Sequence, residues 1–204
     1  MTSNPITPKE IDEIHSIIEK RFKLPLGHVK IGELETLVDK CGKIPFSTKQ
    51  VGIFEQAAAL FEGIVRLHIF TDGNKRTALE TTRQFLNRNS YVLIVPLSGV
   101  NFIYKIAQDC TPDTEKVLRE ITEWLTNHSA ETNQWHRIVG LLVIHIYWPV
   151  FWARFFSKIR LRRCGRWVIK KYLMNEDPQV TEFMIEIYEK QFNLFELARK
   201  QYQK

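Results

Sequence analysis

Apolar residues recur every three or four positions along most of this chain, and that spacing predicts amphipathic helices. The first series follows Thr7-Pro8-Lys9-Glu10, which has the form of a capping box with proline at the first helical position. Its apolar members are Ile11, Ile14, Ile17, Ile18 and Phe22. A second, short helix is expected from Gly32 to Cys41, with Gly42 ending it.

The middle of the chain predicts two stronger helices on either side of a polar interruption. The first carries an apolar series at helical spacing, made of Phe54, Ala57, Ala58, Phe61, Ile64, Val65 and His68. The second runs to about Arg88. Residues 42–52 predict a loop with a small extended piece around 44–46. Residues 91–95 favour a short strand or a buried connector, and residues 102–108 and 112–125 predict two more helices.

The composition is that of a globular protein, with 44% apolar and 25% charged residues. The three cysteines are widely spaced and form no CxxC pair, so neither a disulfide framework nor a cysteine zinc site is indicated. The first residues show neither the basic nor the apolar region of a secretory signal, which favours a cytoplasmic location. We expect a mainly helical domain at residues 1–128 and a helical C-terminal extension at residues 129–204.

The polar interruption, "LHIFTDGNKRTAL" (residues 67–79), concentrates groups that handle phosphate. Gly73 and Asn74 permit a backbone turn whose N–H groups point into one concavity, and the helix that should start there adds partial positive charge. Lys75 and Arg76 supply full charges, and Asp72 is a hard oxygen ligand of the kind that Mg²⁺ uses.

A plainer interpretation exists for each of these residues. A single histidine such as His68 is more often half-buried and bonded to a carbonyl than catalytic, and the other groups would suit a capped, solvated helix corner. The combination of a base, a metal ligand and an anion cradle within nine residues favours an active site instead.

The same stretch resembles the signature of the Fic/Doc family, whose broad pattern is H-x-F-x-[D/E]-[G/A]-N-x-R. The resemblance runs from "TPKEIDEIH" through "FEQAAALFEGIVRLHIF" and "LETTRQFLNRNS" to "ITEWLTNHS", roughly residues 5–129. It implies an all-α, mainly helical Fic/Doc fold with a small β flap. It also implies a transferase that uses ATP and Mg²⁺ to modify a hydroxyl of a target protein.

The resemblance assigns roles residue by residue. His68 would be the general base and Arg76 a second catalytic residue, Phe70 would pack beneath the loop, and Asp72 would hold the metal. The nucleotide phosphates would be bound by Gly73, Asn74, Lys75 and Arg76. The target-binding flap would be formed by Lys43, Ile44, Pro45 and Phe46.

Two positions favour one branch of the family. Fic adenylyltransferases carry Gly where this chain has Lys75 and a second Arg where it has Leu79. Both differences are typical of Doc-type toxins, which implies a kinase acting on Ser/Thr of a translation factor such as elongation factor Tu. AMP transfer is the alternative, and a binding module with a relic motif is a second one. No [S/T]-x-x-x-E-[G/N] segment is present, so inhibition by a separate antitoxin is expected.

The C-terminal extension lies outside the resemblance. Between Thr132 and Asn175 there are nine Lys or Arg residues and no Asp or Glu. The apolar run from Ile138 to Ala153 is shorter than the about 20 residues that a membrane span needs. A buried helical hairpin, a membrane-surface helix, or RNA contact through residues 137–171 are the alternatives. A last amphipathic helix should begin at Asp177-Pro178.

Overall fold

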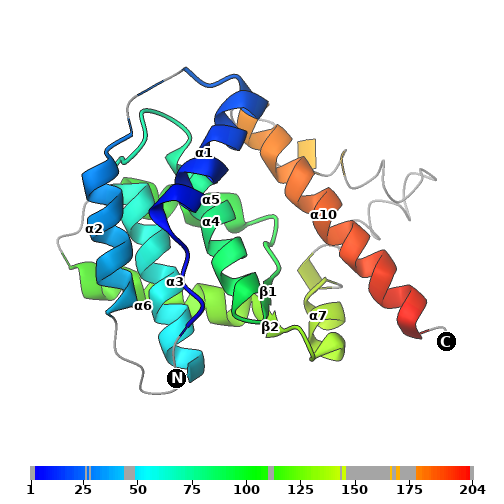
Figure 1. The fold of residues 1–204 in the computed structure, drawn as a ribbon. Coiled ribbons are helices and arrows are strands. Elements are labelled where there is room, and N and C mark those ends of the chain that lie inside the picture. The colour runs from blue at the N-terminus through cyan, green and yellow to red at the C-terminus, as the bar shows by residue number, and fades with distance from the viewer. Residues whose placement is uncertain are drawn as a thin grey trace. The chain divides into compact units, whose positions relative to one another are not determined.

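The computed structural model describes residues 3–25, 27, 29–43, 49–109, 113–142, 144–145, 166, 169–170 and 178–202. These residues are mainly helical, which confirms the predicted fold class (Figure 1). The helices are α1 (Pro8–Phe22), α2 (Ile31–Gly42), α3 (Lys49–Arg66), α4 (Asn74–Arg88), α5 (Gly99–Gln108), α6 (Thr114–Asn127), α7 (Trp135–Leu142) and α10 (Pro178–Tyr202). Two three-residue strands, β1 (Tyr91–Leu93) and β2 (Ser129–Glu131), are the described β structure.

The chain forms two compact units. The first comprises residues 1–93 and 101–127, and the second comprises residues 94–100 and 128–204. The predicted boundary at residues 128/129 remains a prediction, since the short connector 94–100 groups with the C-terminal residues.

The core of the first unit is built around α3, which packs against α2, α4 and α6 (Figure 1). Its apolar side chains occur on more than one face, as a central helix requires. The buried ones include Ile53, Phe54, Ala57, Ala58, Phe61, Ile64 and Val65. Gly63 allows α2 to approach closely, because a Cβ there would lie 2.3 Å from Cδ1 of Leu37.

Helix α1 begins as the sequence predicts, with a capping box in which Thr7 and Glu10 bond each other's backbone N–H. Glu10 also pairs with Arg88 at the end of α4, and that hydrogen bond, with the Thr7 cap, lowers the pKa of Glu10 to about 2. One predicted core position is wrong. Ile17 is 64% exposed, whereas the adjacent turn buries His15, because α1 presents that face to α4.

In the second unit, α10 packs against α7 and its apolar stripe is buried at Phe183, Met184 and Ile187. The helix begins at Pro178, close to the predicted start. The side chains of Phe195 and Ala198, further along the same helix, lie outside the described set. Among the described residues, no helix is long and apolar enough to cross a membrane. Most of residues 137–171, and with them the proposed membrane or RNA contact, lie outside the described residues.

Candidate functional site

The polar stretch forms a loop between α3 and α4, and it places His68 differently from the helical prediction. Helix α3 ends at Arg66, and His68 has a left-handed backbone with φ 47°. Its side chain is therefore exposed, not half-buried at the end of the α3 stripe. Because α3 ends before His68, this residue does not continue the helical stripe of Ile64 and Val65.

Asn74 closes the loop beneath the exposed residues. Its Oδ1 accepts from the backbone N–H of Phe70 at 2.9 Å, and its Nδ2 donates to the Phe70 carbonyl at 2.7 Å. Both polar groups of Phe70 and both functions of the amide are thus satisfied in a buried setting. The Phe70 ring is buried as well, so the loop is anchored at this residue.

Gly73 is the N-cap of α4 and adopts the left-handed region with φ 76°. A side chain at this position would be strained by the backbone, and its Cβ would lie 2.7 Å from Cδ1 of Leu24. The first i→i−4 bond of the helix is donated by the N–H of Thr77 to the Gly73 carbonyl at 2.9 Å. The preceding amides, those of residues 74–76, have no carbonyl within the helix to bond, which is the arrangement of an anion cradle.

Asp72 is exposed at the mouth of this helix terminus. Its Oδ1 accepts from the Gly73 N–H at 2.5 Å. No group of three or more His, Cys, Asp or Glu capable of holding a metal occurs among the described residues. The single exposed carboxylate of Asp72 fits Mg²⁺, because this ion is usually bound by one or two carboxylates together with the phosphates of a substrate and water.

The two cations of the first turn of α4 are each placed over an aromatic ring. Lys75 Nζ lies 4.9 Å from the centroid of the Tyr104 ring on α5. Arg76 Cζ lies 4.9 Å from the centroid of the Phe22 ring at the end of α1, and only 9% of Arg76 is exposed. Both side chains are therefore oriented by cation–π contact close to the cradle.

The segment between α1 and α2 supports the loop. Val29 forms an antiparallel bridge with Phe70, and the N–H of Lys30 donates to the Ile69 carbonyl at 3.0 Å. Gly27 makes room for Thr71, since a Cβ there would lie 2.0 Å from the threonine Oγ1. The glycine of "LPLG" was the available signal, because glycine permits such close approach.

His15 also contacts the loop, although the sequence pattern did not mark it as a site residue. Its ring stacks on Phe70 with the centroids 3.8 Å apart and the planes at 18°. Its Nδ1 lies 3.0 Å from Oγ1 of Thr77. Burial, the largest contribution, lowers the pKa of His15. A histidine within the apolar stripe of Ile11, Ile14 and Ile18 was the signal in the sequence.

The predicted flap is described only in part. Lys43 is exposed just beyond α2, and its ammonium pairs with Asp39 at 2.5 Å. Ile44, Pro45 and Phe46 lie outside the described residues. The structure thus brings together the predicted residues from His68 to Arg76, while the flap remains a prediction.

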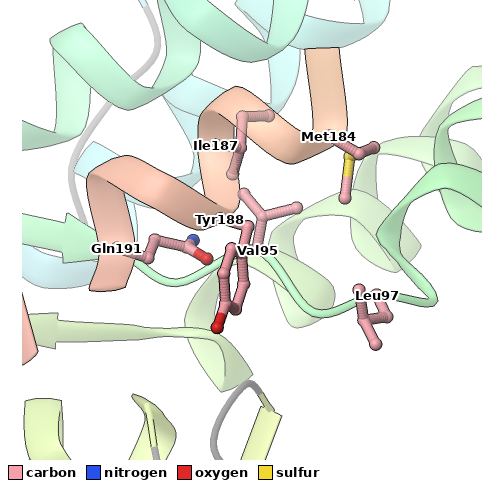
Figure 2. A pocket seen from close by; sticks show the side chains of 6 residues that line it. All are labelled: Val95, Leu97, Met184, Ile187, Tyr188 and Gln191. Atoms are coloured by element: carbon pink, nitrogen blue, oxygen red, sulfur yellow. The ribbon is translucent and has the colours of Figure 1, made fainter. Parts of the chain in front are cut away.

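The second unit contains a cavity between α10 and the connector 94–100, of about 10 Å³. It is lined by Val95, Leu97, Met184, Ile187, Tyr188 and Gln191 (Figure 2). The Gln191 amide accepts from the Val95 N–H at 2.5 Å and donates to its carbonyl at 3.3 Å, in the orientation that satisfies both. A space of this size holds at most one water molecule, so it is not a substrate site.

Comparison with known proteins gives one family match. The model of the Fic/DOC family matches residues 5–86, which include α1 to α4 and the loop between α3 and α4. No curated protein and no solved structure matches the chain. The part of the chain that carries the loop between α3 and α4 is therefore similar to the Fic/DOC family.

Proposed function

We propose that this protein is an ATP- and Mg²⁺-dependent transferase that modifies a Ser or Thr hydroxyl of a target protein. The observation that carries the proposal is the exposed His68 imidazole, held on a braced loop that leads directly into the N-terminus of α4. The similarity of residues 5–86 to the Fic/DOC family points to the same class of protein-modifying transferase.

Each part of the loop has one task in this reaction. His68 accepts the proton of the target hydroxyl, whose oxygen attacks phosphorus. The amides of residues 74–76, with Lys75 and Arg76, bind the nucleotide phosphates. Asp72 would hold Mg²⁺, which neutralises phosphate charge when bound.

Transfer of the γ-phosphate is the reaction that we favour. The hydroxyl oxygen forms a bond to the γ-phosphorus, the bond from that phosphorus to the β–γ bridging oxygen breaks, and ADP leaves. Two residues support this choice. Lys75 adds bulk and charge to the first turn of α4, and Leu79 is fully buried where adenylyltransferases place an Arg. We accordingly propose a Doc-like toxin kinase with a translation factor such as elongation factor Tu as target and a separate antitoxin as inhibitor.

Transfer of AMP is the alternative, in which the hydroxyl attacks the α-phosphorus and pyrophosphate leaves. The two reactions are separated by incubating the protein with a cell extract and either γ- or α-labelled ATP. We expect the γ-label to reach a protein band that contains the target. Label from α-labelled ATP alone would establish AMP transfer, and no label from either would contradict a transferase.

A variant at Lys75 sharpens this test. Leu79→Arg would force a charge into a fully buried position and is expected to destabilise the protein. Lys75→Gly avoids that cost, because Lys75 is only half-buried. If Lys75 blocks AMP transfer, Lys75→Gly should reduce γ-label and gain slow α-label transfer. The matched control is Lys105→Gly on α5, which should leave both labels unchanged.

A further inference from the structure

We propose that His15 is a positioning residue for the transfer reaction, holding the loop and the first turn of α4 in register from beneath. The inference rests on the proposed function, and it adds a residue on α1 to a site that otherwise comes from residues 68–76. Its basis is that one buried side chain touches both the loop, at Phe70, and the first turn of α4, at Thr77.

The contacts of His15 span the loop. Its ring stacks on Phe70, where the loop is anchored, and its Cε1 would lie 3.5 Å from a Cβ placed on Gly73. Its Nδ1 reaches the hydroxyl of Thr77, which is the residue that donates the first helical hydrogen bond of α4. A shift of His15 would therefore move Phe70 and the first turn of α4 together.

The two ring nitrogens of His15 face different partners. Nε2 lies 3.8 Å from Oε1 of Glu19. Nδ1 lies 3.0 Å from the hydroxyl of Thr77, which is fully buried, and the two groups are hydrogen-bonded. Burial lowers the pKa of His15, and Arg76 acts in the same direction, while Glu19, Asp12 and Asp72 oppose it.

The hydrogen bond between His15 and Thr77 is not needed for packing of the core. An apolar ring in place of His15 would keep the stack on Phe70 but leave the buried Thr77 hydroxyl without its partner, which costs stability. Small displacements at a site of this kind reduce rates by large factors, because reaction depends on the geometry of attack. Loss of the hydrogen bond should therefore lower the transfer rate by more than the loss of stability alone would explain.

The test is a double-mutant cycle with His15→Phe, Thr77→Val and the combined variant. His15→Phe keeps the stack and removes the Nδ1 partner, and Thr77→Val removes the hydroxyl with little change of shape. The matched control is Ile14→Val, which trims a buried residue on the same helix. For each protein we would measure kcat, KM for ATP, the melting temperature, and hydrogen exchange at the Phe70 amide, which bonds Asn74.

We expect each single variant to lower kcat about tenfold with a smaller change in KM, and the double variant to be no worse than either single variant. Exchange at Phe70 should be faster in His15→Phe than in Ile14→Val at matched stability. Additive effects in the cycle, or a kcat and an exchange rate equal to those of Ile14→Val, would overturn the role of His15.

Two further outcomes are separated by the design. If His15→Phe fails to fold, Thr77→Val alone decides, since it removes the same hydrogen bond from the other side. If the unmodified protein transfers no label, the proposed function fails. The exchange at Phe70 then decides whether His15 positions the loop, because that measurement needs no activity.

Discussion

The loop in the first unit and the surroundings of the α10 cavity in the second unit share one feature. In each, a side-chain amide bonds both backbone groups of a single residue. In the loop, the amide of Asn74 bonds both the N–H and the carbonyl of Phe70. In the second unit, the amide of Gln191 bonds both backbone groups of Val95 in the orientation that satisfies its two functions. Each is a buried side chain that replaces a backbone partner.

The difference lies in what surrounds the two amides. Above Asn74 the chain exposes His68 and Asp72 next to a helix N-terminus. Gln191 is surrounded by apolar side chains and a cavity too small for a substrate. A buried amide bond thus indicates local order, and a site is indicated only where ordered backbone also leaves reactive groups open to solvent.

The largest expected effect is that of His68→Ala. Removal of the base should lower label transfer by a factor of about 100 or more, since general base catalysis contributes about 10²–10⁴. The melting temperature should stay unchanged because His68 is exposed. His136→Ala, which removes an exposed histidine of α7, is the control and should transfer normally. Undiminished transfer by His68→Ala would disprove the proposed mechanism.

The two amides can be compared directly with Asn74→Ala and Gln191→Ala. Each variant leaves a backbone N–H and carbonyl without their partner, so each should lose about 1–3 kcal/mol of unfolding free energy in denaturant titrations. Only Asn74→Ala should also lower label transfer. Equal loss of transfer in both variants would show that the distinction between the two regions is wrong.

Arg76→Ala should weaken ATP binding about tenfold, because it removes a charge-assisted phosphate contact. Calorimetric titration with ATP and Mg²⁺ gives the dissociation constant. Arg83→Ala is the matched control, since Arg83 is also on α4 and pairs with Glu80 at 3.0 Å. An unchanged affinity for ATP in Arg76→Ala would show that Arg76 does not bind phosphate and only packs on Phe22.

The smallest effect concerns His145 in the second unit, whose ring centroid lies 4.9 Å from that of His128. Burial and His128 lower the pKa of His145 below its ordinary value of about 6.5. As pH falls, His145 therefore takes up a proton in the unfolded chain before it does so in the folded chain. The free energy of unfolding should then fall as pH drops below about 6.5. Melting temperatures between pH 7.5 and 5.5 should decline less in His145→Phe. An identical decline in both proteins would contradict this assignment.

Much of the helical framework follows from local sequence. The capping box at Thr7 and the apolar periodicity of α3 predicted helices that the structure contains, because caps and amphipathic stripes act over a few residues. The motif from His68 to Arg76 is also a local signal in the sequence. Its residues are contiguous, so their proximity is guaranteed by the chain itself.

The details of the site depended on contacts between distant residues. The burial of His15 in place of Ile17 is set by the packing of α1 on α4, and the bridge from Val29 to Phe70 joins residues with 40 positions between them. The exposure of His68 follows from where α3 ends, and helix ends are poorly determined by periodicity.

The sequence by itself determined the mainly helical class, the chemical groups of the loop and their order along the chain. Only the tertiary structure decided that His68 faces solvent, that Asn74 closes the loop on Phe70, and that His15 contacts Thr77. The physical reason is the distance along the chain over which each kind of interaction acts. Periodicity and capping record interactions within a turn or two of helix, whereas burial and side-chain partners depend on which distant surfaces the folded chain brings into contact.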